Sequence, residues 1–197
     1  MKLRLTRIAR KLGYTATPEH SPTRADVFVH EVSYCLEVQL KPTQFRKRTA
    51  AREAKDAKVC WLIREGLDTD KALNALFDLP AVRFRVVDLA DPGRLLTPWD
   101  DPTDRDLARR ARLEFFGTIA HVLPVERRPD PAAPGATWFR TGTMNGFQFL
   151  EEILSGRRRW YRPGVLGYKR DLWALKADVA DYYAYRNKTR EVVKAHG

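Results

Sequence analysis

The sequence predicts an α/β fold in which a mixed β-sheet is flanked by helices. Within residues 1–90, segments with the apolar periodicity of helices alternate with short β-branched and aromatic runs typical of strands. The chain has 197 residues, 44% of them apolar, so it is long enough to bury a core. A turn-rich stretch follows residue 90, and helical patterns dominate after it, so a second, mainly helical region is expected there.

The first predicted elements are a helix and a three-stranded meander. Leu5, Ile8 and Leu12 have helical spacing, and Gly13 is a residue type that commonly follows a helix. Strands are then predicted over residues 14–17, 25–30 and 34–40. The connection between the second and third strands is short enough for a hairpin turn.

Two helices and two further strands should extend this sheet. Pro42 can open a helix at its first position, and good helix formers follow it. The apolar run VCWLI at 59–63 fits a buried strand that runs parallel to the strand at 34–40. A helix over 69–79, capped by Asp68 or Thr69, and an alternating strand at 82–89 complete the predicted core.

The second half of the chain is expected to be a basic, mainly helical region at 104–197, joined to the core by a linker at 91–103. Helices are predicted over 104–123, from about 145, and over 171–195, and a proline-rich linker occupies 124–137. The last helix would carry an aromatic face made of Trp173, Tyr182, Tyr183 and Tyr185.

The charge of the chain favours a polyanionic partner. The net charge is +11, and residues 157–170 contain six arginines or lysines, no acid, and interleaved aromatic residues. Guanidinium groups pair with phosphates and flat rings stack on exposed bases. Nucleic-acid contacts are therefore expected from Arg157, Arg158, Arg159, Trp160, Arg162, Lys169 and Arg170. The alternative is a solvated loop whose aromatic residues anchor it to the last helix.

The cysteines and the apolar runs indicate the cellular compartment of the protein. Cys35 and Cys60 lie in strand-like runs, which favours buried free thiols in a reducing cytosol. Two cysteines cannot form a zinc site alone, and the four histidines lack ligand spacing. No apolar run approaches the length of a membrane span, and no signal peptide follows Met1. A soluble cytoplasmic protein without a membrane partner is expected.

Two carboxylates and an amide mark a candidate metal site. Glu37 and Gln39 are two residues apart on one predicted strand, so their side chains share a face, and Asp26 can reach them from the neighbouring strand. Carboxylates together with a backbone carbonyl and water suit a hard cation such as Mg²⁺. Acids are also common on solvated strand faces, so this spacing alone favours the solvated alternative.

The surrounding sequence resembles a known nuclease family. Asp26, the E-x-Q motif of Glu37, the KRT sequence that includes Arg48, and the VCWLI strand look like the nuclease domain of the CoiA-like competence protein family, which belongs to the PD-(D/E)xK superfamily. The resemblance covers roughly residues 1–90, and its specific part is 24–63. It implies a restriction-endonuclease-like core.

The resemblance also implies roles for individual residues. Asp26 and Glu37 would hold Mg²⁺ or Mn²⁺ together with the Val38 carbonyl. Gln39, which stands in place of the usual lysine, would orient water. Arg48 would act on the scissile phosphate. Further phosphate contacts are expected from Lys41 and Arg52.

This chain departs from the family pattern in three respects. The segment between Gln39 and Arg48 is shorter than usual, and Arg52 stands where a tyrosine is often found. The first helix lacks the acid that superfamily members often contribute, which leaves Glu19 as the nearest candidate.

The implied activity is hydrolysis of phosphodiester bonds in DNA by a metal-dependent endonuclease. An RNA-processing nuclease would use the same site. A catalytically inactive DNA-binding or assembly protein that keeps the fold is the alternative from another class. Superfamily nucleases that cut both strands often pair, so a homodimer is compatible with this activity.

Overall fold

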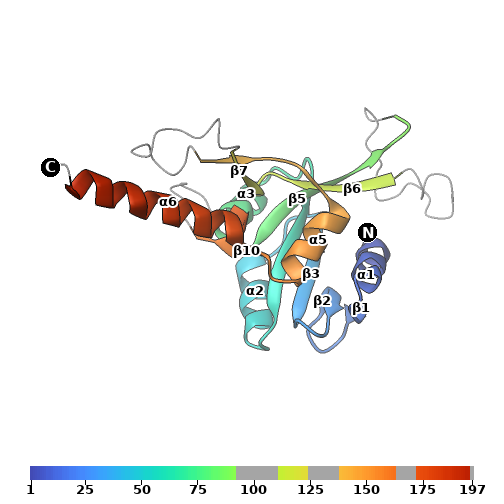
Figure 1. Cartoon of the computed structure of the whole chain (residues 1–197). Helices are drawn as coiled ribbons and strands as arrows, with labels where there is room; N and C mark the ends of the chain where they lie inside the picture. Colours follow the sequence, from blue (N-terminus) through green and yellow to red (C-terminus); the bar gives the residue numbers. More distant parts are fainter. Residues whose placement is uncertain (92–110, 124–137, 163–171, 196–197) are drawn as a thin grey trace.

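A seven-stranded mixed sheet with helices on both faces forms the body of the molecule (Figure 1). The structure is a computed structural model that describes residues 1–91, 111–123, 138–162 and 172–195. The strands of the large sheet, in chain order, are β1 (Ala16–His20), β2 (Ala25–Val29), β3 (Tyr34–Gln39), β4 (Lys58–Arg64), β5 (Ala81–Asp88), β6 (Ala111–Phe116) and β9 (Met144–Asn145). Their spatial order is β1-β2-β3-β4-β5-β6-β9. The β3–β4 and β4–β5 pairs are parallel, and the other pairs are antiparallel.

The element order predicted for residues 1–90 is confirmed. The helices of this part are α1 (Lys2–Lys11), α2 (Phe45–Glu53) and α3 (Asp70–Asp78). The first strand begins at Ala16, two residues later than predicted, and α2 begins three residues after Pro42. The predicted hairpin between β2 and β3 is present, and Ser33 adopts a positive φ of 47° at its end.

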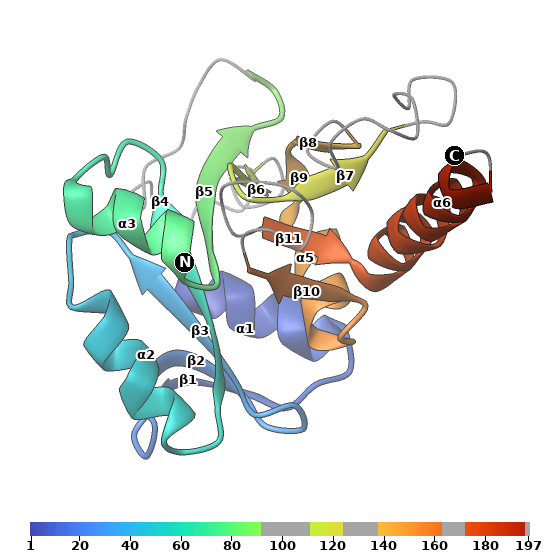
Figure 2. The same cartoon turned by 90° about the vertical axis from the view of Figure 1, so that its left-hand side faces the viewer.

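Each face of the sheet carries its own apolar core. On one face α1 and α5 (Gly146–Leu154) pack through residues such as Leu5 and Phe149 against Leu36 of β3. On the other face α2 and α3 pack through Phe45 and Leu76. The views in Figure 1 and Figure 2 show α1 and α2 on opposite sides of the strands. Because both faces are covered, side chains on either face of β3 are buried.

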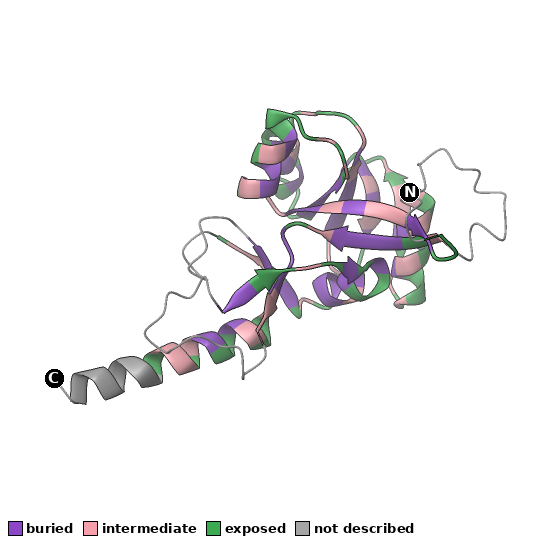
Figure 3. Cartoon of the chain, turned by 90° about the horizontal axis from the view of Figure 1, so that it is seen from above, coloured by how far each residue is buried: buried purple, intermediate pink, exposed green. Residues whose placement is uncertain are grey.

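The helix predicted over 104–123 is wrong for residues 111–123. These residues form β6 and a short strand, β7 (Ala120–Val122). Pairing with the open edge of β5 decides the outcome, because it buries Leu113 and Phe115 in the core while Glu114 on the opposite face meets Arg85 of β5. The sheet therefore continues beyond the boundary expected at residue 90. Figure 3 shows buried segments along these strands.

The described C-terminal residues contain six strands and two helices, so they do not confirm the expectation of a mainly helical region. β7 pairs with β8 (Phe139–Thr141), and β10 (Arg158–Tyr161) pairs with β11 (Leu172–Leu175). The last helix, α6 (Lys176–Ala195), extends away from the body (Figure 1). Trp173 belongs to β11 and not to the helix, because β-pairing with Trp160 places it in the main core.

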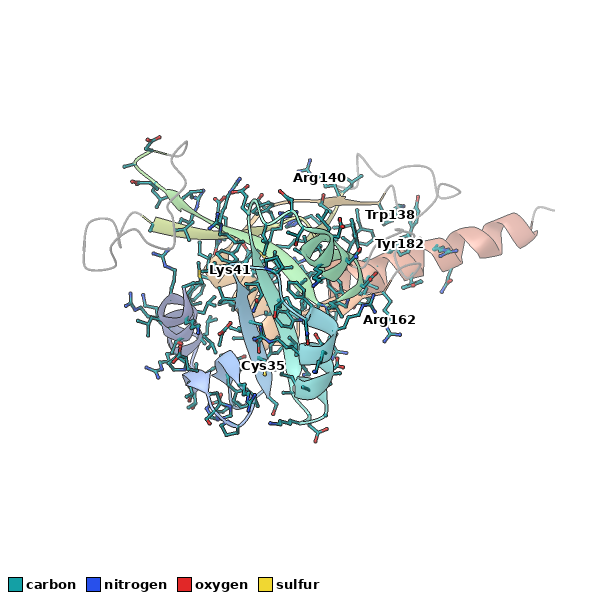
Figure 4. All side chains as sticks on the ribbon, turned by 180° about the vertical axis from the view of Figure 1, so that it is seen from behind. Cys35, Lys41, Trp138, Arg140, Arg162 and Tyr182 are labelled. Atoms are coloured by element: carbon teal, nitrogen blue, oxygen red, sulfur yellow. The ribbon has the colours of Figure 1, made fainter. Side chains whose placement is uncertain are left out.

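A small third core holds α6 to the two hairpins. Trp138 lies 4.4 Å from Tyr185 and 5.5 Å from Tyr182 between ring centroids, and Figure 4 labels Trp138 and Tyr182 at the base of the helix. The aromatic face predicted for the last helix is thus confirmed for two of its tyrosines. The linker predicted at 124–137 and nearly all of that at 91–103 lie outside the described residues. No helix in the described ranges is long and apolar enough to span a membrane.

Candidate functional site

Asp26 and Glu37 lie at the point where β2 and β3 separate. Val27 and Leu36 are the last paired residues, and Asp26 and Glu37 come next in the same register. Beyond this point the backbone N–H of Val38 donates to Asp26 Oδ2 at 2.8 Å, so a carboxylate takes the place of a strand partner. The two predicted acids therefore lie on neighbouring strands at the end of the β2–β3 ladder.

Glu37 is fully buried and both of its carboxylate oxygens accept from arginines of α2. Arg52 Nε lies 2.7 Å from Oε1, and Arg48 Nη2 lies 2.6 Å from Oε2. Burial raises the pKa of Glu37 above its ordinary value, while the positive charges of Arg48 and Arg52 oppose that rise. The two arginines differ in exposure: the Arg52 side chain is 6% exposed and that of Arg48 is 30% exposed.

The helical spacing of α2 explains why both arginines reach the same carboxylate. Residues four apart lie on one helix face, so Arg48 and Arg52 both point at β3. Thr49 beside them accepts a hydrogen bond from Trp61 Nε1 at 2.8 Å, and the Arg48 guanidinium lies 5.1 Å from the Trp61 ring centroid. These contacts join the KRT sequence of α2 to the VCWLI strand.

Asp26 is held from the opposite direction by α1. Lys2 Nζ lies 3.0 Å from Asp26 Oδ1 and 3.0 Å from Glu19 Oε1. The hydrogen bond to Asp26 raises the pKa of Lys2. Glu19, the nearest acid predicted from the sequence, has a 75% exposed side chain, and its described contact is with Lys2. Asp26 is therefore drawn toward α1, and Glu37 toward α2.

The donor atoms suit Mg²⁺, but the surrounding charges oppose it. All four carboxylate oxygens of Asp26 and Glu37 already accept one N–H each, and three of those donors are cations. Each oxygen keeps a second lone pair, so coordination stays open to it. Among the described residues no cluster of three or more His, Cys, Asp or Glu is placed to hold a metal. Shared binding of Mg²⁺ would require Arg48 to leave Glu37, and it would require the two carboxylates, which are paired with helices on opposite faces of the sheet, to turn toward a common ion.

Gln39 and Lys41 occupy positions compatible with their predicted roles. Gln39 is 7% exposed and lies on the same face of β3 as Glu37, where its side chain makes no hydrogen bond to a described residue. Its amide is therefore available to a ligand. Lys41 is exposed just after the strand, and Figure 4 labels it.

Two arginines predicted to contact nucleic acid are buried instead. Arg52 is enclosed because it binds Glu37 and donates to the Arg24 carbonyl at 2.7 Å. Arg158 is 2% exposed: its Nε donates to Glu152 Oε2 at 2.7 Å, and its Nη1 donates to the Ala120 and Trp173 carbonyls. Neither can meet a phosphate on the surface. For Arg158 the cause is strand alternation in β10, which turns every second side chain inward.

The other residues of the predicted basic segment divide into four groups. Trp160 packs on Trp173 with ring centroids 5.4 Å apart, so it anchors β10 to β11 and not to the last helix, which the alternative interpretation had expected. Arg157 forms an ion pair with Glu151. Arg159 and Arg162 are exposed, and Figure 4 labels Arg162. Lys169 and Arg170 lie outside the described residues.

The sequence interpretation missed Lys2 as part of this site. A usable signal was present, because Lys2 precedes the buried Leu5 and Ala9 by three and seven residues and therefore shares their helix face. That spacing directs the lysine toward the sheet.

Comparison with known proteins gives no relative from which to assign this site. No protein-family model matches the chain, and neither a curated protein nor a solved structure matches it.

Proposed function

We propose that this protein is a metal-dependent nuclease of the PD-(D/E)xK type that hydrolyses phosphodiester bonds in DNA. One observation supports the proposal: Asp26 and Glu37 lie on neighbouring strands where β2 and β3 separate, and the Gln39 amide and the half-exposed Arg48 lie near Glu37. The mixed sheet with helices on both faces is the setting that a restriction-endonuclease-like core requires.

The residues of this site divide the work of hydrolysis. Asp26 and Glu37, with the Val38 carbonyl, would hold Mg²⁺ or Mn²⁺. The chemistry supplied by such an ion would be a bound water of lowered pKa and stabilisation of charge on a phosphoryl oxygen. Gln39 orients the attacking water through its amide, but an amide takes up no proton, so the base must come from elsewhere.

Arg48 is the residue best placed to act on the substrate phosphate. Its guanidinium reaches solvent while holding Glu37, so it can exchange the carboxylate for a substrate phosphate. Arg52 keeps its contact with Glu37 because it is enclosed. Arg52 is therefore a positioning residue for Glu37.

Cleavage assays with charge-removing variants test the proposal. Asp26→Asn and Glu37→Gln should each abolish Mg²⁺-dependent cutting of plasmid DNA and of labelled oligonucleotides. Glu53→Gln, which changes an exposed acid at the end of α2, is the control and should cut like the wild type. Thermal melts check folding. Variants at Asp26 and Glu37 that fold and still cut would refute the assignment.

A catalytically inactive DNA-binding or assembly protein is the second candidate, and one observation favours it. Every carboxylate oxygen of Asp26 and Glu37 has a donor without a metal: Lys2 and the Val38 N–H for Asp26, and the two arginines of α2 for Glu37. DNA binding without cleavage in Mg²⁺ or Mn²⁺, unchanged in Glu37→Gln, would favour this candidate. RNA substrates in the same assays decide between DNA and RNA.

A further inference from the structure

A cavity of about 320 Å³ lies between the first turn of α2 and the side of α3. Its apolar lining comes from Phe45, Ala75 and Leu79, and its polar lining includes Thr43 and Asn74. The volume is within the range of small-ligand pockets in proteins, roughly 300–1,000 Å³. The cavity is thus large enough to bury part of a ligand on an apolar surface.

Two lysines at this cavity carry positive charge without a partner in the described part of the chain. Lys47 of α2 and Lys71 of α3 line it, both are exposed, and neither forms an ion pair there. Arg46, the third cation of the lining, is paired with Asp78 at 2.5 Å. The cavity therefore joins an apolar surface to two cations that are free to bind an anion.

The cavity adjoins the candidate site through one residue. Thr43 lines it, and the Thr43 hydroxyl accepts from Arg48 Nη1 at 3.4 Å, while the same guanidinium holds Glu37. A ligand in the cavity would therefore lie next to the residue that acts on the substrate phosphate.

We propose that this cavity binds one unpaired nucleotide of the substrate strand. The base would lie on Phe45, Ala75 and Leu79, and its phosphate would be bound by Lys47 and Lys71. A base enters such a cavity only when it is not paired, so the protein should prefer single-stranded segments or strand ends. The inference rests on the proposed function, which supplies the nucleic-acid partner.

Equilibrium binding with labelled DNA tests the proposal. Fluorescence anisotropy would compare a short oligothymidylate strand with a duplex of equal length, using wild type and the Lys47→Ala/Lys71→Ala variant. The variant should bind the single strand at least about tenfold more weakly and the duplex with little change, because two contacts to one phosphate are lost. The matched control is Lys11→Ala/Lys58→Ala, which removes two exposed lysines outside the cavity.

A second variant tests the apolar part of the cavity. Ala75→Leu narrows it without altering charge, and it should weaken single-strand binding while a thermal melt reports that the protein is folded. Equal losses for single strand and duplex, or equal losses in the lysine control, would overturn the proposal. Thymidine monophosphate binding as tightly as the strand would also overturn it, since the ligand would then be a free nucleotide.

The test separates this inference from the proposed nuclease activity. Glu37→Gln should lose cleavage and keep its preference for single strands. If the wild type cuts nothing but the cavity variants lose single-strand binding, the cavity assignment survives the failure of the nuclease proposal. If Glu37→Gln abolishes cleavage and the cavity variants bind single strands like the wild type, only the cavity assignment fails.

Discussion

Three buried glutamates of the described residues, Glu37, Glu114 and Glu152, are paired with arginines, and the pairs of Glu37 and Glu152 differ in how they meet solvent. Glu152 and Arg158 are both enclosed, with side chains 5% and 1% exposed, and Arg158 also satisfies two backbone carbonyls. Glu37 is enclosed too, but one of its two arginines, Arg48, is 30% exposed. The Glu152–Arg158 pair is closed to solvent, whereas Glu37 has one partly exposed partner, Arg48, that a ligand could displace.

This difference separates a structural ion pair from a candidate reactive one. Removing one partner of a buried pair leaves an uncompensated charge and costs about 3–5 kcal/mol. An arginine at the rim can leave its carboxylate at lower cost, because water solvates the arginine as it separates and, at Glu37, Arg52 remains as a partner. A buried Glu–Arg pair alone therefore does not indicate function; the exposure of the arginine is what distinguishes the two.

The largest predicted effect concerns the closed pair. Arg158→Ala should lower the free energy of unfolding by about 3–5 kcal/mol, because Glu152 and two backbone carbonyls lose their donor. Urea unfolding followed by circular dichroism measures the change. Arg159→Ala, at the exposed neighbouring position, is the control and should change stability by less than about 0.5 kcal/mol. A loss below about 1 kcal/mol at Arg158 would contradict the structural role.

The next prediction compares the two arginines that share Glu37. Arg52→Ala should cost about 3 kcal/mol, because it removes an enclosed partner of a buried carboxylate. Arg48→Ala should cost about 1 kcal/mol, because water can reach the oxygen it leaves. On the proposed function, Arg48→Ala should nevertheless abolish DNA cleavage. Urea melts and cleavage assays on both variants should show that stability depends mainly on Arg52 and cleavage on Arg48. Equal losses of stability in the two variants would contradict this comparison.

The smallest predicted effect is the pH dependence of stability that comes from His121, which feels the charge of Arg158 in the closed pair. His121 is half-buried on β7, and its pKa is lowered first by burial and then by the charge of Arg158. The ring is therefore harder to protonate in the folded state than in the unfolded state. The stability that the neutral ring contributes to the folded state is complete above its ordinary pKa of 6.5 and is lost as the pH falls below that value. His121→Asn should therefore lose less stability than wild type between about pH 7.5 and 5.5, by less than about 1 kcal/mol. Parallel pH-dependent slopes in urea melts would contradict this assignment.

The sequence was most informative where structure is local. The strands and helices between residues 1 and 90 follow from short patterns, and the E-x-Q motif and Arg48 come together because a single strand–helix–strand unit carries them. Residues 111–116 were mispredicted because their role depends on β5: Glu114 is at once a helix-compatible residue and the partner of Arg85.

Burial of the basic residues could not be deduced from composition. Arg158 and Arg159 are adjacent and chemically identical, but pairing of β10 with β11 encloses one and exposes the other. The partner strand begins eleven residues after β10 ends, and Glu152 lies on the preceding helix, so no local pattern identifies the enclosed residue. Lys2 likewise reaches Asp26 from a distant part of the chain.

The pairing of β5 with β6 has a consequence for how the chain is made and handled. Until residues 111–116 leave the ribosome, β5 offers a row of unsatisfied amide and carbonyl groups to any neighbouring chain. A recombinant fragment cut after residue 90 would keep that open edge permanently and would be prone to aggregation. The minimal unit for expression therefore extends at least through α5, whose packing against α1 closes the core.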